Sequence, residues 1–137
     1  MMMEKIKVTV SWSGDNYCAA TGNIGGVVLV TNKSFEGLKK EFEETFKFHI
    51  DGCVADGDYI EEYIQKGEFE FDFNLQASAL LHRVDGIITR AALARITGIN
   101  ERQLGHYMTG HSKPRPAQRE KIITGLHKIG LEFLTVE

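Results

Sequence analysis

The stretch that decides the fold of the second half of the chain is Thr89–Gly110, which reads TRAALARITGINERQLGHYMTG. Apolar residues recur at helical spacing in residues 90–97 and again in residues 101–108. Gly98 stands between these segments, where glycine permits the left-handed backbone that turns the chain. Asn100 is a good N-cap for the second segment. The stretch therefore predicts two short helices joined by a tight turn.

The second of these helices would turn a polar face outward. Arg102 and Gln103 belong to the residue types that form paired hydrogen bonds with guanine and adenine in the major groove. His106 follows on the same side, so we expect these three side chains to read bases. The predicted DNA-contacting residues are Asn100, Arg102, Gln103, His106 and Tyr107, with Lys113, Arg115 and Arg119 assigned to phosphates.

Two short helices with a glycine turn also occur in plain helical bundles. Ala94 is small where the two helices should approach most closely, and Ile99 should bury in the angle between them. Residues 90–121 hold 7 basic and 2 acidic side chains, a balance of +5. These features resemble a Cro/repressor-type helix-turn-helix and favour DNA binding over a bundle. Arg90 and Arg95 stay open to two interpretations, as phosphate contacts or as ion-pair partners of Glu101 or Glu120.

The two halves of the chain differ in charge. Residues 1–77 hold 7 basic and 14 acidic side chains, a balance of −7, whereas residues 78–137 hold 9 and 5, a balance of +4. A basic half suits a polyanion such as DNA. An acidic half could suit a basic protein, although an acidic surface is ordinarily just solvated. The split predicts two modules with different partners, residues 1–76 and 77–137.

The first module alternates between strand and helix patterns. Residues 68–75 show the clearest period-two alternation of apolar and polar side chains. Residues 27–31 are apolar and β-branched, which is typical of a central strand. A helix that begins after Ser34 and ends at Asp51-Gly52 carries a phenylalanine-rich stripe that should pack on the sheet. The expected elements are strands at 4–12, 17–21, 27–31 and 68–75, helices after Ser34 and at 58–65, and a hairpin turn at 22–26, which together make a small β-β-β-α-β domain of the α+β class.

The second module has helical patterns throughout. Besides the two short helices, residues 77–84 and a last helix from Ala117 carry apolar stripes. Gly130 offers an alternative end for the last helix, which would leave residues 131–136 as a strand. We favour a helix that continues past Gly130. The second module is therefore expected to be an all-α helix-turn-helix domain.

Taken together, the order of the modules resembles the HicB family of antitoxins. The matching pieces are the strands at 5–12, 27–31 and 68–75, the helix that begins with Ser34, and the helix-turn-helix. The resemblance implies a degenerate ribonuclease-H-like first domain and a DNA-binding second domain. Two segments, Gly22–Gly26 and Asp51–Gly67, depart from the compact connections usual in that family.

The resemblance also implies a function. The first domain would bind and mask a small basic toxin that cleaves messenger RNA, and the second would bind the operator of its own operon. Helix-turn-helix domains usually act in pairs on two half-sites, so we expect a homodimer or a higher even oligomer. The alternative is a stand-alone regulator whose first domain senses a ligand or only mediates dimerisation.

Enzymatic activity is not expected. Nuclease chemistry on a ribonuclease-H-like fold needs several carboxylates that converge on a divalent metal, whereas most acids here lie in turn clusters such as residues 56–58. His106, His111 and Cys53 lack the spacing of a metal site. The glycine-rich loop at 22–26 lacks the lysine of a phosphate-binding loop. We therefore predict no catalytic residue, no metal and no cofactor.

The sequence also bears on location. No apolar run approaches the roughly 20 residues of a membrane-spanning helix, and the first residues lack the pattern of a signal peptide. We therefore expect a cytoplasmic protein that does not associate with membranes. Cys18 and Cys53 stand far apart and are expected to be free thiols.

Overall fold

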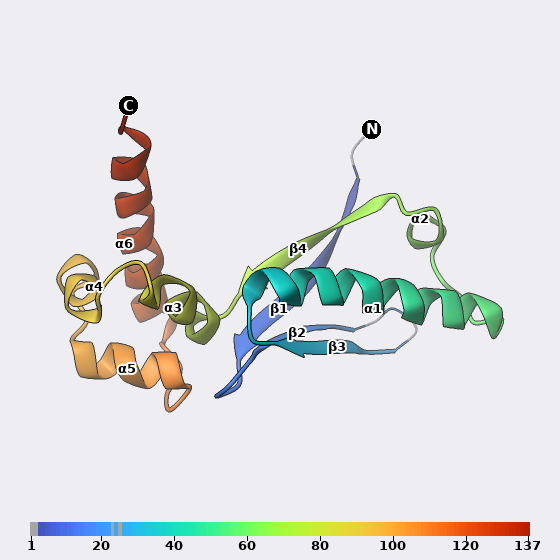
Figure 1. Ribbon diagram of the computed structural model, residues 1–137, viewed down its shortest axis with the longest axis horizontal. Coiled ribbons are helices and arrows are strands. Elements are labelled where there is room, and N and C mark those ends of the chain that lie inside the picture. The colour runs from blue at the N-terminus through green and yellow to red at the C-terminus, as the bar shows by residue number, and fades with distance from the viewer. Residues whose placement is uncertain (1–2, 23, 25) are drawn as a thin grey trace. The chain divides into compact units, whose positions relative to one another are not determined.

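A computed structural model describes residues 3–22, 24 and 26–137. The chain divides into two compact units, Met1–Gln76 and Ala77–Glu137. The fold is α+β, with strands toward the N-terminus and helices after them, as the sequence pattern indicated (Figure 1). The expected turn at residues 22–26 includes Asn23 and Gly25, which lie outside the described residues.

The first unit is built on a four-stranded sheet in the order β3-β2-β1-β4. β1 pairs antiparallel with β2, and β2 pairs antiparallel with β3, whereas β1 and β4 run parallel. The parallel pair is possible because the chain crosses over one face of the sheet between β3 and β4 (Figure 1). The strands are β1 at Glu4–Trp12, β2 at Tyr17–Thr21, β3 at Val28–Asn32 and β4 at Phe69–Leu75.

The expectation of a central strand at residues 27–31 is wrong, because β3 is an edge strand. Its inward residues Val28 and Val30 are buried, but Leu29 is 58% exposed. A continuous apolar run is typical of a strand that is covered on both faces. Here only one face of β3 is covered by a helix, so the apolar run does not indicate burial on both faces, and it does not determine the place of the strand in the sheet.

Helix α1, Phe35–Ala55, covers one face of the sheet. Its N-terminus is capped by Ser34, whose hydroxyl accepts a hydrogen bond from the backbone N–H of Gly37 at 3.0 Å. The predicted end at Asp51-Gly52 is wrong, because the helix continues until just before Gly57, which has a φ of 78°. Continuation buries one more side chain of the stripe, which consists of Leu38, Phe42, Phe46, Ile50 and Cys53.

The core of the first unit is rich in aromatic rings. Phe42 and Phe46 are buried on α1, and both meet Phe71 of β4 edge-on, with ring centroids 5.2 and 4.9 Å apart. Burial of each phenylalanine contributes roughly 1.5–3 kcal/mol, and edge-to-face pairs add to this. The rings on β4 itself are only half-buried, so this side of the core stays partly open to solvent.

Helix α2 is shorter than the predicted helix at 58–65 and spans only Glu62–Gln65. The preceding segment is instead anchored by Ile60, which is buried. The Gln65 side-chain amide donates to the Ile60 carbonyl at 2.7 Å. This bond satisfies a backbone acceptor that a longer helix would have satisfied.

The second unit is all helical: α3 at Ala77–Asp85, α4 at Arg90–Thr97, α5 at Glu101–Thr109 and α6 at Pro116–Leu134. The expected continuation of the last helix past Gly130 is confirmed. No helix in the described part of the chain combines the length and apolar character needed to cross a membrane. The buried core of this unit consists of Leu81, Leu93, Ile99, Leu104, Tyr107, Met108 and Ile122.

Candidate nucleic-acid interface

The turn between α4 and α5 is fixed by two short-range features. Gly98 adopts the left-handed conformation at φ 75° and ψ 12°, and its N–H donates to the Ala94 carbonyl at 2.9 Å. Asn100 then starts α5, because its side-chain oxygen accepts from the Gln103 N–H at 2.8 Å. Both features were predicted from residue type, since glycine and asparagine are the residues these positions favour.

A buried hydroxyl holds the same turn from the inside. Thr97 Oγ1 donates to the Leu93 carbonyl at 2.7 Å and accepts from the Ile99 N–H at 3.2 Å. Thr97 is 7% exposed, and its hydroxyl bonds replace those lost to water. Ile99 is itself buried, as expected for the residue in the angle between the helices.

Two glycines lie at close contacts between helices in this unit, and neither was expected from the sequence pattern. A Cβ at Gly125 of α6 would lie 3.0 Å from Ile96 Cγ2 and 3.2 Å from Thr97 Cγ2 of α4. A Cβ at Gly105 of α5 would lie 3.1 Å from the Arg90 guanidinium. A glycine inside a helix carries an entropic penalty. A glycine inside a predicted helix is therefore a sign, visible in the sequence, that a larger side chain would not fit at that position.

The three predicted base readers differ in their surroundings. Arg102 is exposed on the first turn of α5. Gln103 is half-buried, and its side-chain amide donates to Ser112 Oγ at 3.2 Å. The His106 ring packs against the His111 ring in a tilted arrangement, with ring centroids 4.6 Å apart. Arg102 is therefore the most accessible of the three, whereas Gln103 and His106 also tie the following loop to α5.

The expectation that Tyr107 faces outward is wrong. Its side chain is 5% exposed and belongs to the core of the unit, one helical turn beyond Leu104. The residue lies on the apolar stripe of α5, which has a period of 3.6 residues. Its phenolic group made a polar assignment plausible in sequence. The aromatic ring is instead buried in the core of the unit.

The predicted phosphate contacts lie in the loop after α5 and at the start of α6. Lys113 and Arg115 are exposed, and Arg119 is half-buried. Arg115 occupies the N-cap position of α6, and Pro116 is the first residue of that helix. The N-terminus of a helix carries partial positive charge. The exposed cations Lys113 and Arg115 and this helix end therefore together favour an anion.

Of the two arrangements considered for Arg90 from sequence, the ion pair with Glu101 or Glu120 is not among the ion pairs of the described residues, and the phosphate contact stays a prediction. The Arg90 guanidinium lies against Gly105 and donates from Nη2 to Met108 Sδ at 3.5 Å. The side chain therefore spans from α4 to α5, although the residue as a whole is exposed. This placement gives Arg90 a role in holding the two helices together.

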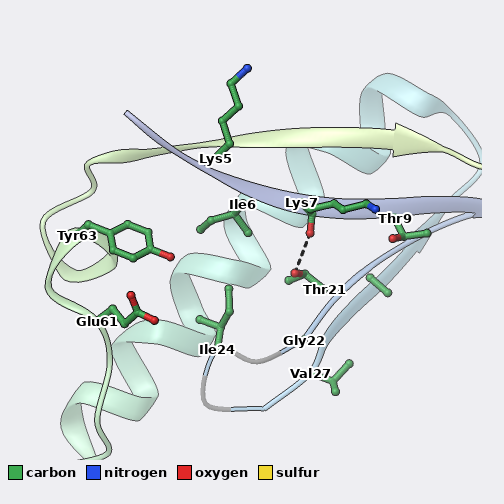
Figure 2. A pocket seen from close by; sticks show the side chains of 11 residues that line it. Lys5, Ile6, Lys7, Thr9, Thr21, Gly22, Ile24, Val27, Glu61 and Tyr63 are labelled. Carbon is green, nitrogen blue, oxygen red and sulfur yellow. Dashed lines mark hydrogen bonds between the residues drawn. The ribbon is translucent and has the colours of Figure 1, made fainter. Parts of the chain in front are cut away.

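A cavity of about 650 Å³ lies on the first unit (Figure 2). Figure 2 shows the Tyr63 hydroxyl and the Glu61 carboxylate directed into it, whereas the Lys5 ammonium points away. Burial raises the pKa of the Tyr63 hydroxyl, and the nearby carboxylates Glu61 and Glu4 raise it further. Because its lysines do not converge, the cavity lacks the concentrated positive charge that an anion site needs.

Metal ligands do not cluster in the part of the chain that the structure describes. Within it, no group of three or more histidine, cysteine or carboxylate side chains could hold a metal ion. His49 and Cys53 approach one another on α1, with 3.6 Å between Nε2 and Sγ. The His49 Nε2 also lies 2.9 Å from the Ile24 carbonyl oxygen, to which it can only donate. Because the hydrogen bond to Ile24 ties α1 to the segment before β3, His49 and Cys53 have a structural role.

No family model, curated protein or solved structure matches the chain.

Proposed function

We propose that this protein is a DNA-binding regulator of the antitoxin type. In this proposal the second unit binds operator DNA through α5, and the first unit binds a small basic toxin that cleaves messenger RNA. The observation that carries the proposal is the pair α4 and α5, joined at Gly98 in the left-handed conformation with Arg102 exposed beyond the turn. Repressor-type domains place such a second helix in the major groove.

The charge of each unit supports this division of labour. The residues from 78 onward carry a balance of +4, and those up to 77 carry −7. The first favours contact with phosphates, and the second favours association with a basic protein. Both activities are binding functions, so the proposal needs no catalytic group and no cofactor.

The proposed regulator would act as a homodimer or a higher even oligomer. One helix in one major groove buries little surface, whereas two copies on half-sites about one helical turn apart double the contact. The operator is therefore expected to be an inverted repeat. Autoregulation follows if the repeat lies in the protein's own promoter.

Arg102→Ala tests the DNA-binding half of the proposal. A bidentate arginine contact to guanine contributes roughly 1–3 kcal/mol of discrimination, or about 5- to 150-fold in affinity. We expect this loss on operator DNA from the native promoter, and little change on random DNA of equal length. Lys128→Ala removes an exposed cation from the middle of α6 and is the control. Equal losses on both DNAs would show that Arg102 does not read bases.

The cavity on the first unit favours a second candidate, a stand-alone regulator that senses a ligand. Purification of the full chain from its native host distinguishes the two. The antitoxin proposal is supported if a small basic protein co-purifies with the chain and if the chain blocks cleavage of messenger RNA by that protein. If no such protein is recovered and a small molecule shifts operator binding, the second candidate is correct.

A further inference from the structure

The outer edge of β4 presents backbone groups to which no strand pairs in the described sheet. The Glu4 N–H donates to the Glu68 carbonyl at 3.3 Å, and the Gln76 N–H donates to the Val10 carbonyl at 2.8 Å. In a strand of a parallel ladder, alternate residues direct both backbone groups to the same neighbour. The even-numbered residues of β4 therefore bond to β1, and the backbone groups of Phe69, Phe71 and Phe73 point outward.

An apolar groove adjoins this edge. It has a volume of about 380 Å³ and lies between α1, the segment around α2 and β4, where Phe46 packs against Phe69 and Phe71. Charged side chains of α1 and of residues 64–67 line its rim. The phenylalanines of β4 are only half-buried, so apolar area is exposed beside outward backbone groups. A strand added to β4 would cover this area with every second side chain.

The opposite face of β4 is acidic. Glu70 and Asp72 are exposed there, and in the register of the sheet they lie beside Lys5 and Lys7 of β1. The inner edge of β4 thus pairs with a strand, β1, whose lysines lie on the acidic face of the sheet and whose apolar residues lie on the other face. A strand on the outer edge meets the same two faces and is favoured by the same pattern.

We propose that the outer edge of β4 binds an extended segment of a partner protein, in which apolar residues alternate with lysine or arginine. The segment adds as a fifth strand, with its backbone paired to Phe71 and Phe73 and its basic side chains beside Glu70 and Asp72. This inference rests on the proposed function, because it says where the first unit binds its basic partner.

A second copy of the chain fits the edge less well. β4 carries no basic residue, so pairing with its own copy gives its acidic face no opposite charge. Charged residues on an edge strand disfavour pairing between like edges. The same acidic side chains attract a basic strand. The charge on β4 therefore favours a basic partner over a second copy of the chain.

Hydrogen exchange on the full-length protein, followed residue by residue by NMR, tests the inference. The probe is the synthetic peptide KIKVKVK with blocked ends, and EIEVEVE is the control peptide. The basic peptide should slow exchange of the Phe71 and Phe73 amides by roughly tenfold or more. The amides of Glu70 and Asp72 already bond to β1, so they should not change and they report that the sheet stays intact.

Charge reversal sharpens the test. Asp72→Lys should abolish the protection by the basic peptide, and Asp72→Asn should weaken it, whereas Glu44→Lys on the exposed face of α1 should leave it unchanged. The inference is overturned if the basic peptide protects neither amide, or if both peptides protect equally. It is also overturned if the amides gain protection with protein concentration alone, because a second copy then occupies the edge. None of these results bears on operator binding or on toxin co-purification, which test the proposed function separately.

Discussion

The Gln103 side-chain amide donates to Ser112 Oγ at 3.2 Å, so a residue of α5 holds the loop that leads into α6. The Ser112 N–H in turn donates to the His106 carbonyl at 3.3 Å. The loop that carries Lys113 is therefore tied to the helix that carries Arg102. These two hydrogen bonds therefore link the element of a proposed base contact to the loop of a proposed phosphate contact.

Ser112→Ala should destabilise the second unit. A half-buried hydrogen bond contributes about 0.5–1.5 kcal/mol, and the variant loses it while leaving Gln103 in place. Urea unfolding measures the change, and a double-mutant cycle with Gln103→Ala isolates the pair. The two substitutions should be less destabilising together than the sum of their separate effects. Strict additivity would mean that the bond contributes nothing.

Gly98→Ala should destabilise the same unit by roughly 1–2 kcal/mol, because alanine at a φ of 75° brings its Cβ close to the following carbonyl. No other atom lies within 4 Å of the added Cβ, so the effect isolates the backbone conformation. Gly86→Ala is the matched control, since its Cβ also meets nothing and its φ lies outside the left-handed range. It should be neutral or stabilising by up to about 1 kcal/mol. Similar effects at both positions would contradict the assignment of Gly98 as the turn residue.

The stability of the second unit should fall below neutral pH because of His82. Burial lowers the pKa of its imidazole, and the Asp85 carboxylate and the Met108 backbone only partly oppose this. The unfolded chain takes up the proton at pH about 6.5, before the folded chain does. Stability is therefore complete above that pH and decreases as the pH falls toward the folded pKa. His82→Gln should show a shallower decrease in melting temperature between neutral and mildly acidic pH, and an identical profile would exclude His82 as the cause.

The sequence predicted those elements whose signals are local. Residue type alone located the turn at Gly98 and the cap at Asn100, because backbone conformation and capping depend on a few neighbouring residues. Tyr107 was misplaced because a tyrosine suits both a core and a surface. Its burial depends on how α5 packs, which the sequence does not state.

Long-range features could not be predicted from the sequence. Strand order decides whether β3 is central or at an edge, and its apolar run fits either position. The outward backbone of β4 depends on the parallel register with β1, which forms between residues more than sixty positions apart. The contact between Gly125 and α4 is of the same kind, because only the packed structure shows which helices meet.

Lys113→Ala should change the salt dependence of operator binding. Each neutralised phosphate contributes about 0.9 to the slope of log affinity against log salt concentration. The exposed ammonium of Lys113 lies in the loop braced by Gln103 and Ser112, so its removal should reduce the slope by about that amount. The loss should be equal on operator and random DNA, because a phosphate contact carries no sequence information. Lys128→Ala should leave the slope unchanged, and fluorescence anisotropy titrations at several salt concentrations measure both. A slope that stays constant in Lys113→Ala would place the DNA on another surface of the second unit.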